Sequence, residues 1–258
     1  MLRVVALLIC GATLLSAFSN ARGAEPQTGI EARLSSDRMG RVEAGTYLAD
    51  DRVAFGLDST GAYYLLSFTG APEIFVLHPD SASLGGRILK YDTGETALLV
   101  SGWGALTLYT DSAPGGLPAV RTGDFSTPAL PAVSLEDVQD AAADAAGQLS
   151  ALQRLSLAFS ADWTALSASA QTRAIALDAL ENVTHGIERF CQSPRGRNVI
   201  SRRIAAVDFA VAGRPTVTLD GKTLIVTLNP DLGYEGRASS RSIAFALGSL
   251  LSAPKNQS

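Results

Sequence analysis

A change of hydrophobic period near residue 130 constrains the fold more than any other feature of the chain. From Gly45 to about Gly123, short apolar segments alternate with turn residues at a spacing of about ten, which is typical of antiparallel strands. From Ser134 onward, apolar residues recur every three or four positions, which indicates amphipathic helices. We therefore predict an α+β protein whose N-terminal antiparallel β-rich meander, a sandwich or barrel-like sheet, is followed by a helical pair, a β-hairpin and a C-terminal helix.

The expected strands are short runs of branched and aromatic residues bounded by turn residues. They are Thr46–Ala49, Arg52–Leu57, Ala62–Phe68, Glu73–His78, Arg87–Tyr91, Ala97–Ser101 and Ala105–Thr110. The sequence Pro114-Gly115-Gly116 indicates a further turn.

The helical part begins with Ser134-x-x-Asp137, which resembles a capping box with a shortened acid. The spacing predicts a helix from Ser134 to about Phe159. A second helix is expected from about Ser167 or Ser169, and it ends before Pro194, where proline forbids continuation.

The last part of the chain predicts a hairpin and a helix. Asp220-Gly221 joins two alternating segments between Pro215 and Leu228, and this dipeptide is typical of a two-residue type I′ turn. A final helix is expected from about Ser239 to Leu251.

The first residues of the sequence indicate an export signal. Arg3 precedes an apolar run from Val4 to Phe18, and small residues follow around Ala21, which is the pattern of a secretory signal peptide. We expect cleavage after Ala21, with Gly23 as second choice; an uncleaved anchor is the alternative. The run is shorter than the roughly 20 residues of a membrane span, and no later run reaches that length. The sequence thus predicts a periplasmic or secreted protein without a transmembrane segment in its mature chain.

The predicted organisation is a signal peptide (1–21), a polar arm (22–44), a β-rich lobe (45–127), a proline-containing linker (128–133) and an α-α-β-β-α lobe (134–254). The length allows the two lobes to be separate domains or one α+β unit.

Charge and motifs exclude several functions. The chain has 21 Lys and Arg against 25 Asp and Glu, a net charge of −4 that disfavours nucleic acid as a partner. It contains no glycine-rich nucleotide loop and no ligand pair at metal spacing, so the sequence predicts neither a cofactor nor a metal.

The segment before the last helix is the most specific candidate for a binding site. The free N–H groups of a helix start, the hydroxyls of Ser239 and Ser240, and the charge of Arg237 suit a carboxylate or phosphate. Tyr234 would form a wall of such a site. The simpler interpretation is that a serine caps the helix and that Arg237 is a surface charge.

Nucleophilic chemistry is a weaker possibility. The candidate residues are Cys191, His185 and His78, but Cys191 and His185 lie about 120° apart on a helix and would not meet unless the helix ends between them. A buried, inert thiol is the simpler interpretation. The sequence therefore favours a non-enzymatic envelope-associated protein that binds an unknown partner; the alternatives are a small anionic-ligand binder using Arg237 and the helix start, and an envelope hydrolase.

Several motifs resemble an uncharacterised exported-protein family of alphaproteobacteria that carries a domain of unknown function. They are Gly45-Thr46-Tyr47, Phe55-x-Leu57-Asp58-x-x-Gly61, Leu65-x-x-Phe68, Tyr91-Asp92-x-Gly94, Gly104-x-Leu106-Thr107-Leu108-Tyr109-Thr110, Pro114-x-Gly116-x-Pro118-Ala119 and Gly233-Tyr234-x-Gly236-Arg237-x-Ser239-Ser240. The resemblance implies export and an α+β build, and it transfers no activity and no catalytic residues.

Overall fold

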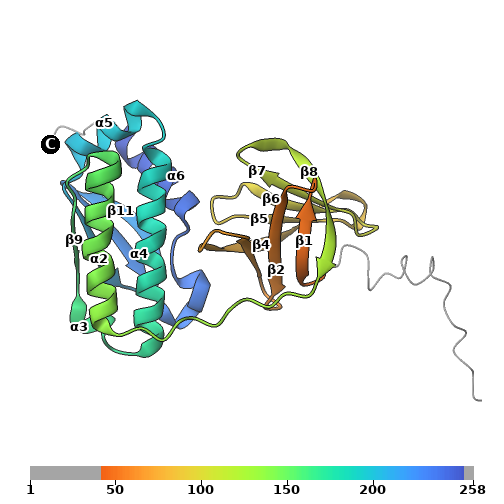
Figure 1. The fold of residues 1–258 in the computed structure, drawn as a ribbon, viewed down its shortest axis with the longest axis horizontal. Coiled ribbons are helices and arrows are strands. Elements are labelled where there is room, and N and C mark those ends of the chain that lie inside the picture. The colour runs from red at the N-terminus through yellow and green to blue at the C-terminus, as the bar shows by residue number, and fades with distance from the viewer. Residues whose placement is uncertain (1–41, 253–258) are drawn as a thin grey trace, which may run out of the picture.

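The computed structural model describes residues 42–252 and shows two lobes side by side, a β-barrel and a helical lobe built on a small sheet (Figure 1). The α+β class predicted from the sequence is confirmed. The predicted signal peptide and most of the predicted polar arm lie outside the described residues. Between Val42 and Ser252, no helix has the length and hydropathy needed to cross a bilayer.

The first lobe is a closed antiparallel barrel of eight strands in chain order. The strands are β1 (Gly45–Ala49), β2 (Val53–Ser59), β3 (Tyr64–Phe68), β4 (Ile74–Ser81), β5 (Arg87–Lys90), β6 (Thr96–Val100), β7 (Leu106–Thr110) and β8 (Ala113–Gly123), with a short 3₁₀ turn η1 (Ser83–Gly85) before β5. Alternate residues point inward, as the pattern in β1 illustrates, so side chains fill the interior.

Aromatic rings form a continuous row inside the barrel. Tyr47 stacks on Phe55 at 5.4 Å between ring centroids, and Phe55, Phe68, Phe75 and Tyr91 follow at separations of 5.4–6.4 Å. The row leads from β1 to the loop after β5. It ends at Tyr91, beside the helical lobe.

Strand β8 was not expected, because Pro114-Gly115-Gly116 indicated a turn. The structure places these residues inside β8, which pairs with both β7 and β1 and closes the barrel. Its partner β1 lies about seventy residues earlier in the chain, and a local pattern does not reveal such a partner.

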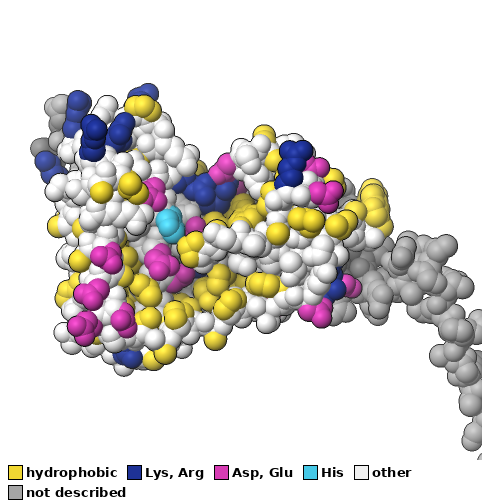
Figure 2. Space-filling model, in the orientation of Figure 1, with side chains coloured by type: hydrophobic (Ala, Val, Ile, Leu, Met, Phe, Trp, Pro, Cys, Tyr) yellow, Lys and Arg dark blue, Asp and Glu magenta, His cyan; other side chains and the backbone are white. Residues whose placement is uncertain are grey.

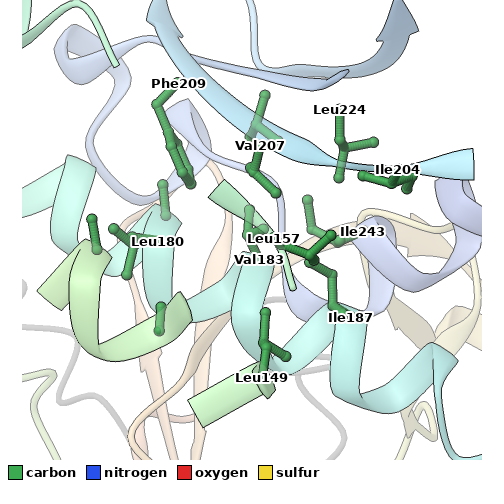
Figure 3. Close-up of a cluster of buried hydrophobic side chains, with 14 of the residues drawn as sticks. Leu149, Leu157, Leu180, Val183, Ile187, Ile204, Val207, Phe209, Leu224 and Ile243 are labelled. Atoms are coloured by element: carbon green, nitrogen blue, oxygen red, sulfur yellow. The ribbon is translucent and has the colours of Figure 1, made fainter. Parts of the chain in front are cut away.

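The second lobe packs helices on one face of a mixed sheet with strand order β11-β12-β10-β9 (Figure 1). Its elements are α2 (Leu135–Gln148), the π-turn η2 (Leu149–Gln153), β9 (Ala158–Ala161), α3 (Trp163–Leu166), α4 (Ala170–Phe190), α5 (Pro194–Arg203), β10 (Ala206–Val211), β11 (Thr216–Asp220), β12 (Thr223–Leu228), η3 (Pro230–Gly236) and α6 (Ser240–Ser252). Figure 3 shows Val183 and Ile187 of α4 and Leu149 packed toward Val207 and Leu224 of the sheet. The helices thus cover the apolar face of the sheet.

Several local predictions are confirmed. Ser134 and Asp137 form a reciprocal capping box at the start of α2, and Ser169 caps α4. The hairpin register pairs Val217 with Val226 and Leu219 with Leu224, so the predicted apolar face is correct.

The first helix is shorter than predicted. It ends at Gln148 rather than near Phe159, because η2 follows and Arg154 adopts a left-handed conformation (φ 57°) that stops the helix. Phe159 lies in β9, which pairs in parallel with β10. This pairing joins segments far apart in the sequence and overrides the local helical pattern.

The second helix ends before Pro194, as predicted, since the last residue of α4 is Phe190. The sequence did not predict the helix that follows. Pro194 occupies the first turn of α5, where its missing N–H costs nothing, and Ser193 caps this helix.

The hairpin turn is not of type I′. The register pairs Asp220 with Thr223, so the two loop residues are Gly221 and Lys222. Gly221 has a positive φ (56°), whereas Lys222 is not among the residues with positive φ. A positive φ at the first loop residue alone is typical of type II′, and the prediction placed the turn one residue too early.

Candidate functional site

A cleft of about 670 Å³ lies where one end of the barrel faces helices α4 and α6. Figure 2 shows a hollow between the two lobes in which acidic and basic side chains gather. The barrel end is formed by the loops that follow β1, β3, β5 and β7. We call this cavity the interlobe cleft; it is lined by Val53, Phe68, Gly70, Ala71, Pro72, Glu73, Phe75, Tyr91, Thr110, Asp111, Ser112, His185, Glu188, Arg189, Gln192, Ser240 and Arg241.

The start of α6 receives two carboxylates from the barrel. Asp92 accepts hydrogen bonds from the backbone N–H (2.9 Å) and the hydroxyl (2.7 Å) of Ser239. Glu73 accepts from the backbone N–H (2.7 Å) and the hydroxyl (2.6 Å) of Ser240. These bonds satisfy donors that a helix start leaves free. The helix start therefore binds carboxylates, as its chemistry predicts, but these carboxylates are side chains of the protein itself and not an external ligand.

Arg237 is a buried link between the lobes rather than a surface charge. Its side chain is 1% exposed and its Nε forms an ion pair with Asp178 of α4. Its Nη2 donates to the carbonyl oxygen of Ile74 in β4 at 2.5 Å. Tyr234 lies under the guanidinium, 5.4 Å from ring centroid to Cζ, and its hydroxyl donates to the carbonyl oxygen of Pro128 at 3.4 Å.

The four predicted site residues thus lie together at the junction of the lobes. Ser239, Ser240 and Arg237 reach across to the barrel, and Tyr234 reaches the connecting segment. An external anion at this place would have to displace Asp92, Glu73 or Asp178.

A second set of charges bridges the lobes at the interlobe cleft. Asp111, in the β7–β8 loop, forms ion pairs with Arg189 of α4 and with Arg241 of α6, the latter at 2.7 Å. We call these three residues the arginine bridge. Arg241 also pairs with Glu95 at 2.8 Å and lies over the ring of Tyr91, 4.4 Å from the centroid. Burial raises the pKa of Asp111, but hydrogen bonds and charge from both arginines outweigh it, and the net pKa lies below the ordinary value.

Glu73 is the most deeply placed acid of the interlobe cleft. Burial raises its pKa, and the hydrogen bonds from Ser240, together with the charges of Arg237 and His185, offset this only in part. His185 lies one turn before Glu188 and Arg189 on α4 and lines the same cavity. The cleft therefore contains an imidazole and a carboxyl group near each other.

The arginine bridge separates the interlobe cleft from a neighbouring cavity of about 530 Å³. Both cavities are lined by Asp111, Arg189, Gln192 and Arg241, and the neighbour adds the rings of Phe190 and Phe245. Both guanidinium groups are thus reachable from two cavities.

The structure does not bring the three candidate nucleophilic residues together. His185 lines the interlobe cleft, whereas the exposed His78 lies 3.9 Å from Glu235. Cys191 is buried in the helical core, and burial raises its pKa to about 11. A thiol nucleophile needs a lowered pKa, so the environment of Cys191 opposes that role.

Sequence reasoning missed Glu73, Asp92 and Asp111, which accept the hydrogen bonds from the second lobe. Each stands at or next to the end of an expected strand, where an acid reads as a turn residue. The sequence did mark the position of Glu73, because this acid lies between Pro72 and the apolar run that begins at Ile74. The chain distances of 147 and 167 residues to Ser239 and Ser240 gave no indication of a partner.

Across residues 42–252, no group of three His, Cys, Asp or Glu side chains is placed to hold a metal ion. The fold and the site define a two-lobed α+β protein in which a closed barrel opens onto a helical lobe. The chain belongs to the family described as domain of unknown function DUF4908, whose match spans residues 26–247. Neither the curated proteins nor the solved structures gave a match.

Proposed function

We propose that the protein is an exported, non-enzymatic binding protein that takes a small ligand into the interlobe cleft. The observation that carries this proposal is the cleft itself, because its volume of about 670 Å³ falls within the range of small-molecule sites. Barrel mouths and boundaries between lobes are also preferred places for such sites.

The lining supports a ligand with both apolar and polar parts. Phe68, Phe75 and Pro72 provide apolar surface, while His185 of α4 and Gln192, in the turn after α4, provide polar groups. Mostly apolar walls with a few polar groups are typical of ligand sites.

The two alternative functions make different demands. An anion binder that uses Arg237 and the helix start has to displace the carboxylates of Asp178, Glu73 and Asp92. A hydrolase has to work without the buried thiol of Cys191, which leaves His185 in the cleft as its base. These demands favour the binding proposal.

The binding proposal is tested with the neutral fluorescent dye N-phenyl-1-naphthylamine. Ala71 is exposed and lines the interlobe cleft, so Ala71→Trp fills part of it. Ala105 lines a cavity at the other end of the barrel, which makes Ala105→Trp a matched control. We expect dye binding by the wild type and the control, and binding at least about tenfold weaker in Ala71→Trp. No binding by the wild type, or equal binding by Ala71→Trp, would overturn the proposal.

The export part rests on the leader pattern, and mass spectrometry tests it. The full chain, expressed in a Gram-negative host and recovered from the periplasm or medium, should begin at Arg22, with Ala24 as the second site. A cytoplasmic product that retains residues 1–21 contradicts export.

A further inference from the structure

We infer that the ligand of the interlobe cleft is a monoanionic carboxylate with an apolar tail, and that its head group replaces Asp111 between Arg189 and Arg241. This inference rests on the proposed function, because it names the ligand class of that same cleft.

The arginine bridge holds a carboxylate that can leave. The side chain of Asp111 is 58% exposed at the tip of the β7–β8 loop, whereas Arg241 is only 14% exposed. Both arginines belong to helices and Arg241 is also held by Glu95, while the carboxylate comes from a loop. If Asp111 turns into solvent, it regains water, and an incoming carboxylate makes the same charge-assisted hydrogen bonds.

The incoming carboxylate only replaces the hydrogen bonds that Asp111 makes, and the ligand loses translational freedom when it binds, so the rest of the ligand has to supply affinity. The same cavity offers apolar surface at Val53, Phe68 and Pro72. An alkyl chain that covers this surface gains about 25 cal/mol for each Å² removed from water. A tail is therefore required, and a small anion such as acetate should bind weakly.

The neighbouring acids select a single negative charge. Glu188 and Glu73 line the cleft beside the arginine bridge. A dianionic phosphate would meet repulsion from these carboxyl groups, whereas a monoanion matches the charge of Asp111. The head group is accordingly a monoanion, and a carboxylate is the group that matches Asp111 in shape as well as in charge.

The test measures binding of decanoate, decanol and acetate by calorimetry. We expect decanoate to bind at least about tenfold more tightly than decanol, and acetate to bind more weakly than both. Equal binding of decanoate and decanol overturns the head-group assignment but leaves the cleft as a binding site. If neither binds, and the dye also fails to bind, the proposed function fails as well.

Two variants locate the head group. Asp111→Asn removes the competing carboxylate and should tighten decanoate binding about tenfold, while Arg189→Gln should weaken it about tenfold. Asp124→Asn and Arg121→Gln are matched controls, because this exposed pair lies outside the cleft; both should bind decanoate as the wild type does. Unchanged or weaker binding in Asp111→Asn, or unchanged binding in Arg189→Gln, would overturn the inference.

Discussion

Ser240 donates two hydrogen bonds to the carboxylate of Glu73, at 2.7 Å from its backbone nitrogen and 2.6 Å from its hydroxyl. The two residues are 167 positions apart and belong to different lobes. A barrel residue therefore caps the last helix of the chain, and the start of that helix is formed by both lobes together.

The buried ion pair of Arg237 should be important for stability. Arg237→Ala leaves Asp178 without its partner and the carbonyl oxygen of Ile74 without its donor, and we expect a loss of about 3–5 kcal/mol in the free energy of unfolding. Urea denaturation measures this loss. Arg121→Ala breaks an exposed pair with Asp124 and should cost less than about 1 kcal/mol. Similar losses in the two variants contradict the assigned role of Arg237.

The raised pKa of Glu73 predicts that the contribution of this residue to the free energy of unfolding depends on pH. Because burial raises this pKa above 4.5, the folded state holds the proton more tightly than the unfolded state. The contribution of Glu73 to stability is thus present at low pH and is lost as the pH rises through the folded pKa.

Glu73→Gln removes the ionisation and keeps an oxygen acceptor for Ser240. Relative to the wild type, this variant should gain stability between about pH 4 and about pH 7. Chemical denaturation at the two pH values checks the sign. A relative stability that stays constant or falls over this range is the opposite result.

Cys191 should react slowly in the folded protein. Its pKa is raised from 9.0 to about 11, which lowers the thiolate fraction near neutral pH roughly 100-fold, and burial restricts access further. The rate of modification by iodoacetamide measures this protection, with the protein in guanidinium as the reference. Native labelling as fast as in guanidinium would show an accessible thiol.

Gly186 permits the close contact of α4 and α6. A Cβ atom on Gly186 would lie 2.5 Å from Cβ of Ile243, so Gly186→Ala should cost about 1–3 kcal/mol. Gly147 in α2 has nothing within 4 Å of such an atom, and Gly147→Ala should stabilise the helix by up to about 1 kcal/mol. Thermal unfolding should show a lower Tm for Gly186→Ala and an equal or higher Tm for Gly147→Ala. A Gly186→Ala variant with the Tm of the wild type would exclude the close contact.

Sequence patterns predicted the parts of the fold that depend on neighbouring residues. Ser134 with Asp137, the caps of the long helix, and the alternation around Gly221 act within a few positions. Sequence patterns did not predict the strands whose pairing partner is distant in the chain. Strand β8 depends on β1, and β9 depends on β10.

In the candidate site, too, local features were predicted and distant partners were not. The residues Tyr234, Arg237, Ser239 and Ser240 were recognised because a helix start has a known chemistry. Their partners Glu73 and Asp92 were not, since only the packing of the two lobes brings them within hydrogen-bond distance. Asp178 was missed as well, because it lies on α4, 59 residues before Arg237. The interlobe cleft, which depends on the same packing, had no local signal at all.

An NMR titration of the ¹⁵N-labelled protein with decanoate tests the central claim most directly. Binding in the interlobe cleft predicts shifts of the backbone amides of Gly70, Ala71, Ser112 and Gln192, which line it from both lobes. Absence of shifts, or shifts confined to Trp103 and Val120 in the cavity at the other end of the barrel, would contradict the account.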